Sequence, residues 1–129
     1  MWLSTCFKPS YDEETVTGMI RGMEERGIPL GVFHFDCYWL RPLHWCDFEW
    51  DREQFPDVRG MLSRYHERGL KLCAWINPYV AQDTEMFEEG RREGYFLMSA
   101  DGSKTLEITA VLENGELRVE PEIGLVTRV

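Results

Sequence analysis

The sequence predicts an α/β fold built on a parallel β-sheet, and three observations support this prediction. Three apolar runs, at 2–7, 30–36 and 70–76, have the length and the aromatic and β-branched content of buried strands. Each of the first two runs is followed by a segment with helical spacing that ends at a glycine. The order strand, helix, glycine, strand then repeats, which is typical of right-handed βαβ units with helix-covered parallel strands.

The two strand–helix units can be aligned with a shift of 42 residues. In the first unit, Ser10 and Glu13 have capping-box spacing, and Gly27 is placed to end the helix. In the second unit, the helical spacing begins after Asp57 and ends at Gly69. The matched positions are Val16 and Val58, Met19 and Met61, Ile20 and Leu62, Met23 and Tyr65, Glu25 and Glu67, Arg26 and Arg68, and the two glycines.

The last third of the chain departs from this repeat. A weaker third copy of the unit begins near Thr84 and continues through Gly94 to an apolar stretch at 95–98. Beyond it, loosely alternating residues flank Asn114-Gly115, which is the strongest two-residue hairpin signal. Residues 105–120 are therefore predicted to form a β-hairpin.

Composition and charge limit the class of protein. A chain of 129 residues that is 43% hydrophobic and 29% charged is long enough for one globular core. A net charge of −9 without a basic run argues against nucleic acid or an anionic membrane as a partner. No apolar run reaches the length of a membrane span, and Met1-Trp2 does not open a signal peptide. The four cysteines lack zinc-site spacing, so we expect reduced thiols in a cytoplasmic protein.

Several aromatic and polar residues follow the three predicted strands directly. Ligands of parallel α/β folds bind beyond the carboxyl ends of the strands, and ring faces beside carboxylates suit a sugar. The alternatives are that the aromatic residues belong to the core and that the carboxylate caps a local turn. The candidate pocket residues are Phe7 after the first strand, Asp36, Cys37, Tyr38 and Trp39 after the second, and Trp75 after the third.

Other kinds of chemistry are less favoured. A metal site could be drawn from His44, Cys46 and Asp47, but their spacing matches no compact ligand pattern. A nucleophilic pair would have to join Cys37 or Cys73 to His34. Strand alternation points His34 and Cys37 to opposite sides, and nothing indicates an activated thiolate. We therefore expect no metal and no cofactor.

Three motifs occur at consistent separation: FHFDCYW at 33–39, WCDFEWD at 45–51 and WINPY at 75–79. Together they resemble glycoside hydrolase family 31, most closely its bacterial α-xylosidases. The resemblance covers roughly residues 1–103 and implies that they form about the first three βα units of a (β/α)₈ TIM barrel. Residues 104–129 would then be a β-hairpin or extended tail of unclear origin.

The resemblance also implies roles for individual residues. The position of Asp36 binds sugar hydroxyls where the glycosidic bond is cut, and the position of Trp75 helps to wall that subsite. The positions of Phe7, Cys37 and Tyr38 shape the pocket around C5, which favours a sugar without a hydroxymethyl group. Phenylalanine is the more familiar residue at the Tyr38 position.

The chain departs from the family in its catalytic residues. A retaining glycosidase needs a nucleophile and an acid/base about 5 Å apart. In the family both lie on later barrel segments, and nothing after Asp101 resembles the stretch around the nucleophile. We therefore expect a fragment of a retaining α-glycosidase that acts on terminal α-xylosides and is inactive alone.

Two other interpretations stay open. One is a non-catalytic carbohydrate-binding or scaffold module derived from a glycosidase barrel, and the other is a partial barrel that does not fold alone. The expected ligand is an α-xyloside or α-glucoside. Open sheet edges also predict self-association.

Overall fold

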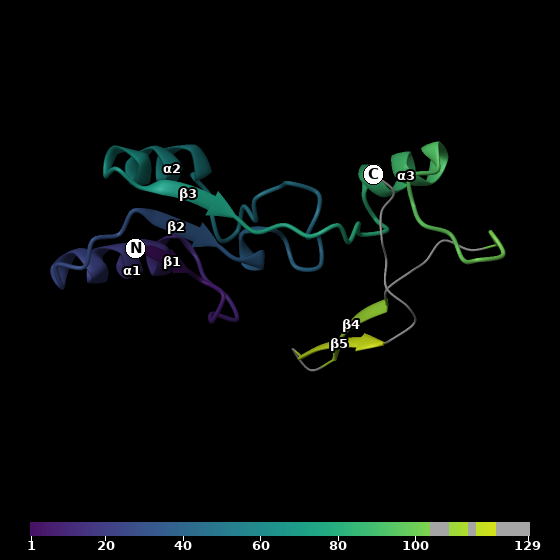
Figure 1. The fold of residues 1–129 in the computed structure, drawn as a ribbon, viewed down its shortest axis with the longest axis horizontal. Coiled ribbons are helices and arrows are strands. Elements are labelled where there is room, and N and C mark those ends of the chain that lie inside the picture. The colour runs from purple at the N-terminus through teal and green to yellow at the C-terminus, as the bar shows by residue number, and fades with distance from the viewer. Residues whose placement is uncertain (104–108, 114–115, 121–129) are drawn as a thin grey trace. The chain divides into compact units, whose positions relative to one another are not determined.

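The computed structural model describes residues 1–103, 109–113 and 116–120, and the chain divides into two compact units (Figure 1). The first unit contains Met1–Pro42 and Phe48–Ile76, and the second contains Leu43–Asp47 and Asn77–Val129. None of the helices in the described part of the chain has the length and hydrophobicity needed to cross a membrane.

The first unit is built on a three-stranded parallel sheet in the order β1 (Trp2–Ser4), β2 (Val32–Phe35) and β3 (Lys71–Ala74). This confirms the predicted parallel sheet, although each strand is shorter than its apolar run. The first strand ends early because the chain turns there, with the Lys8 N–H donating to the Thr5 carbonyl at 2.8 Å. The second strand ends at a short 3₁₀ helix, η1 (Cys37–Trp39).

Two helices follow the first two strands, α1 (Glu13–Glu25) and α2 (Val58–Glu67). The predicted capping box at Ser10 is wrong: the N-cap is Asp12, whose carboxylate accepts the Thr15 N–H at 2.8 Å. The predicted ends are confirmed by Gly27 and Gly69, which have φ of 65° and 80°. Glycine suits these positions because a side chain is strained at positive φ.

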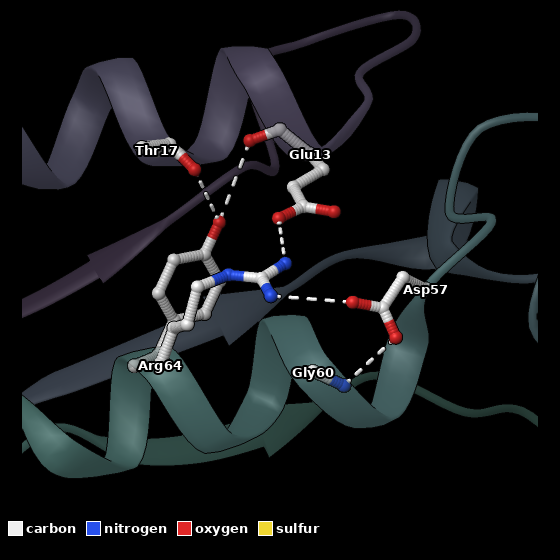
Figure 2. A network of polar contacts seen from close by, with 6 residues as sticks. Glu13, Thr17, Asp57, Gly60 and Arg64 are labelled. Atoms are coloured by element: carbon white, nitrogen blue, oxygen red, sulfur yellow. Dashed lines mark hydrogen bonds and ion pairs between the residues drawn. The ribbon is translucent and has the colours of Figure 1, made fainter.

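The two helices lie side by side and are joined by polar contacts (Figure 2). The Thr17 and Tyr65 hydroxyls are 2.8 Å apart, and the Arg64 guanidinium pairs with Glu13 of α1 and with Asp57. Because α2 also packs on β3, both helices cover the same face of the sheet.

The core of the first unit lies between these helices and the sheet. In β2, Phe33 and Phe35 are buried and alternate with the half-buried Val32 and His34, as the strand pattern predicted. The other face of the sheet carries Trp2, which is 60% exposed and contacts the His34 ring. Further buried side chains come from the two helices and from the loop before α2. They include Val16, Ile20, Met61, Tyr65 and Phe55.

The second unit contains α3 (Glu85–Glu93), which begins at the N-cap Thr84 and ends at Gly94, as predicted. The apolar stretch at 95–98 does not continue the repeat as a strand. Phe96 instead stacks on Phe87 at a ring distance of 5.1 Å and lies over Gly90, where a Cβ would be 2.6 Å from its ring. Packing against the helix therefore overrides the strand preference of this stretch.

The predicted hairpin is supported by its two strands. The strands β4 (Thr109–Glu113) and β5 (Glu116–Glu120) pair antiparallel, with Glu113 opposite Glu116. The predicted turn at Asn114-Gly115 and residues 105–108 lie outside the described residues.

Two helical glycines provide a matched test of the network in Figure 2. Alanine at Gly18 meets no atom within 4 Å, so Gly18→Ala should stabilise the chain by about 0.5–1 kcal/mol through helix propensity. A Cβ at Gly60 would lie 2.0 Å from Asp57 Oδ2 and 2.8 Å from an Arg64 nitrogen. Gly60→Ala should therefore displace the Asp57 carboxylate and gain no stability. Urea unfolding of both variants measures the difference, and equal gains would contradict the importance of the Asp57–Arg64 contact.

Candidate functional site

The predicted site residues follow the carboxyl ends of the three parallel strands. Asp36 comes directly after β2, Trp75 comes directly after β3, and Phe7 lies in the turn after β1. Since these ends meet at one edge of a parallel sheet, the three segments share that edge. Phe7 is 63% exposed, while Asp36 and Trp75 are half-buried.

Asp36 is the N-cap of η1, and its Oδ1 accepts the Cys37 N–H at 2.9 Å. The alternative that this aspartate caps a local turn is therefore confirmed. The cap does not exclude a pocket role, because a carboxylate has about four acceptor sites and one N–H occupies one of them. The half-buried carboxylate can still accept hydrogen bonds from a ligand.

The backbone of Asp36 is held by two residues of the segment between β1 and α1. Its N–H donates to Thr5 Oγ1 at 2.8 Å, and its carbonyl accepts the Tyr11 hydroxyl at 2.6 Å. Burial raises the pKa of Tyr11 far above its usual range, and the charges of Asp36 and Cys37 add to this. Tyr11 is thus a neutral donor at all ordinary pH values.

Cys37 and Tyr38 occupy η1 beside Asp36. Burial, followed by the nearby Asp36 charge, raises the pKa of the Cys37 thiol to about 11. A thiol with such a pKa is a poor nucleophile near neutral pH. His34, the histidine considered as its activating base, has another partner, since its Nδ1 is hydrogen-bonded to Ser4 Oγ at 2.8 Å. The Tyr38 side chain is 37% exposed and is open to solvent at this edge.

Trp75 is fixed through its backbone. Its N–H donates to the Phe35 carbonyl at 2.8 Å, and its carbonyl accepts the Trp39 indole N–H at 2.7 Å. Trp39 was expected to continue the pocket wall, but it is only 5% exposed and packs on Trp50 at a ring distance of 4.9 Å. That expectation is wrong, because Trp39 anchors the end of β3 from within the core.

The residues considered for a metal site have other partners. The His44 ring lies 3.0 Å from an Asp83 carboxylate oxygen, and Cys46 Sγ lies 3.8 Å from Met86 Sδ. Within residues 1–103 and the two described strands beyond them, no three His, Cys, Asp or Glu side chains are grouped to hold a metal.

A concave region lies elsewhere in the first unit. It is an open groove of about 670 Å³ at the start of β3. Its position at the amino-terminal half of the strand separates it from the candidate edge, and it contains none of the predicted site residues. It is lined by Leu62, Ser63, His66, Glu67, Lys71 and Leu72.

The sequence did not identify two residues that shape the candidate edge, Thr5 and Tyr11, and it did not reveal that the Trp39 indole anchors this edge. Thr5 was hidden in the first apolar run, and Tyr11 lay just before a helix. Their bonding partners are 25 to 36 residues away along the chain, so no local pattern could reveal them.

Comparisons with known proteins point to one family. The TIM-barrel domain of the glycosyl hydrolases family 31 matches residues 1–117. An α-xylosidase from Emericella nidulans is 55% identical over 103 residues, which is 80% of this chain and 13% of that protein. The α-xylosidase XylQ from Lactiplantibacillus pentosus is 51% identical over 102 residues, which is 79% of this chain and 13% of that protein. The chain thus spans a small part of these relatives.

A solved structure shows the same fold. It is the family 31 α-xylosidase from a soil metagenome in complex with xylose, which superimposes with a TM-score of 0.63. The superposition covers 79% of this chain and 15% of that chain, with 22% sequence identity. At this identity the similarity is one of fold.

The raised pKa of Cys37 predicts its reactivity. At pH 8, Cys37 in the folded chain should react with iodoacetamide at least about ten-fold more slowly than in the urea-unfolded chain, because little thiolate is present. Asp36→Asn should speed the reaction by removing the neighbouring charge. Asp47→Asn is the matched control, since burial, followed by the Asp47 charge, raises the pKa of Cys46 instead. Mass spectrometry of each alkylated cysteine gives the rates, and equal effects of both variants on Cys37 would contradict the assignment.

Proposed function

Because this chain belongs to glycoside hydrolase family 31, we propose that it forms the opening part of the family's catalytic barrel and one wall of a pocket for a terminal α-xyloside. The observation that carries the proposal is the position of Asp36. Its carboxylate follows the central strand of the sheet, between the segments that contain Phe7 and Trp75. A carboxylate flanked by aromatic side chains is suited to sugar hydroxyls and the C–H face of a sugar ring.

In this proposal, residues 1–103 are about the first three βα units of a (β/α)₈ barrel, and residues 104–129 are a separate tail. The parallel order of β1, β2 and β3, with both helices on one face, supports it. The aligned lengths of 103 and 102 residues in the two α-xylosidases also support it. The barrel would close around the face that carries Trp2 and His34.

The role of each pocket residue follows from its chemistry and exposure. Asp36 would accept hydrogen bonds from sugar hydroxyls, and the half-buried Trp75 would form an adjoining wall. Phe7, Cys37 and Tyr38 would surround C5 of the sugar. Cys37 is held in η1, so an added hydroxymethyl group would meet a filled space. The high identity to two α-xylosidases supports xyloside over glucoside.

Hydrolysis by a retaining glycosidase needs two carboxylates about 5 Å apart across the bond. In the family that the sequence resembles, both lie on later barrel segments, and nothing after Asp101 resembles the stretch around the nucleophile. We therefore propose that the chain binds the sugar weakly and does not cleave it by itself. The second candidate, a non-catalytic carbohydrate-binding or scaffold module, is favoured by the same observation. A parent protein with both carboxylates in frame would distinguish the first from the second.

Binding and turnover test the proposal together. Amide-shift titration should show methyl α-xyloside bound about ten-fold tighter than methyl α-glucoside, since one hydroxymethyl group is worth about 1–3 kcal/mol. Asp36→Ala should abolish binding, whereas Asp51→Ala should not, although Asp51 also accepts backbone N–H groups. A chromogenic α-xyloside should not be hydrolysed. Turnover that survives purification and disappears in Asp36→Ala would contradict the proposed catalytic incompleteness.

Self-association is expected from the open sheet. Both outer strands offer unpaired backbone groups, and Trp2 exposes an aromatic ring on the face without helices. Trp2→Lys should shift the chain toward monomer in sedimentation velocity at increasing concentration. Tyr95→Lys, which replaces an aromatic residue of the second unit that is 54% exposed, should not. A monodisperse monomer of the unsubstituted chain at every concentration would contradict the idea.

A further inference from the structure

Two buried side chains are hydrogen-bonded to the backbone of Asp36, one to its N–H and the other to its carbonyl. Thr5 has no exposed surface, and its Oγ1 accepts the Asp36 N–H at 2.8 Å. Tyr11 is 3% exposed, and its hydroxyl donates to the Asp36 carbonyl at 2.6 Å. The same carbonyl accepts the Trp39 N–H of η1 at 3.2 Å. Neither Thr5 nor Tyr11 is among the proposed sugar contacts.

The polar atoms of these two residues are not needed for packing. The Tyr11 ring packs against Phe35 and Phe55 at ring distances of 6.5 and 5.8 Å, and a phenylalanine ring could make the same contacts. At position 5, valine has the same branched shape as threonine. The Tyr11 hydroxyl adds a bond to the Asp36 carbonyl, and the Thr5 hydroxyl adds a bond to the Asp36 N–H besides a longer one of 3.5 Å to the His34 carbonyl. Buried hydroxyls aimed at one residue point to a role at that residue.

The two bonds also limit the motion of the Asp36 side chain. Its Oδ1 is bonded to the Cys37 N–H at 2.9 Å, so the carboxylate is tied to η1. With the N–H and carbonyl of Asp36 also fixed, the backbone cannot rotate to redirect the carboxylate. The carboxylate is therefore preorganised before any ligand arrives, which reduces the entropy lost on binding.

We propose that Thr5 and Tyr11 are positioning residues, which act through Asp36 to hold its carboxylate ready for a sugar hydroxyl. The identity of the ligand rests on the proposed function, whereas the positioning of Asp36 does not. Thr5, which directly follows β1, accepts the Asp36 N–H. Tyr11, in the loop before α1, donates to the Asp36 carbonyl. Two residues that are 31 and 25 positions from Asp36 along the chain thereby set the geometry of its carboxylate.

Four variants of the full 129-residue chain separate positioning from general stability. Thr5→Val and Tyr11→Phe keep the shape and remove one hydroxyl each, and Thr5→Ser keeps the hydroxyl. Tyr65→Phe is the matched control, because it removes another buried tyrosine hydroxyl, bonded to Thr17 at 2.8 Å and not to Asp36. If Thr5→Val fails to fold, Tyr11→Phe still tests the proposal.

The first readout needs no sugar. In the ¹⁵N-labelled chain, hydrogen exchange at the Asp36 amide should be about ten-fold faster or more in Thr5→Val, and within about three-fold of the unsubstituted chain in Thr5→Ser. The Cys37 amide reports on its bond to Asp36 Oδ1, so its proton shift should move in Tyr11→Phe. Tyr65→Phe should leave both amides unchanged.

The second readout is the affinity for methyl α-xyloside. Thr5→Val and Tyr11→Phe should each weaken it about five-fold or more, whereas Thr5→Ser and Tyr65→Phe should stay within about two-fold. If the unsubstituted chain binds no α-xyloside, the proposed function fails, and the amide readouts still decide the positioning role. Unchanged Asp36 and Cys37 amides in both hydroxyl-deletion variants would overturn the positioning role, as would changes equal to those in Tyr65→Phe.

Discussion

The first unit depends on the pairing of its central strand with both neighbours. β2 is in register with β1 on one side and with β3 on the other, and this pairing continues one step past each strand end. The Thr5 N–H donates to the His34 carbonyl at 3.1 Å, and the Trp75 N–H donates to the Phe35 carbonyl at 2.8 Å. A parallel pair is joined only through a long crossover, and α1 and α2 are the helices of the two crossovers in this sheet.

That constraint explains why polar groups gather at one edge. Where the ladder ends, the backbone groups of Asp36 lose their strand partners and need others, because a buried unpaired N–H or carbonyl is costly. Thr5, Tyr11 and η1 supply those partners. Trp39 does the same for the carbonyl of Trp75. The backbone groups of Asp36 and Trp75 are therefore hydrogen-bonded although they lie in loops, and loops at this edge are where parallel α/β folds bind ligands.

The two faces of the sheet are unequal in a way that fits a partial barrel. One face is covered by α1 and α2, which are joined by Thr17, Tyr65 and the Arg64 ion pairs (Figure 2). The other carries exposed Trp2 beside His34, whose ring is bonded to Ser4. In a closed barrel this second face is the interior, and side chains of other strands would fill it. Membership of family 31 and the small share of the relatives that the chain spans agree with this interpretation.

The sequence by itself determined the features that depend on neighbours along the chain: the strand alternation at Phe33 and Phe35, the helix ends at Gly27 and Gly69, and the motifs that identify the family. A local signal also failed at the start of α1, where the N-cap is Asp12 rather than the predicted Ser10. Only the tertiary structure decided that Phe96 packs on Gly90 instead of forming a strand, that Trp39 is buried, and that Thr5 and Tyr11 hold Asp36. These outcomes depend on which distant residue fills a space or satisfies a buried polar group, and that information exists only once the chain has folded.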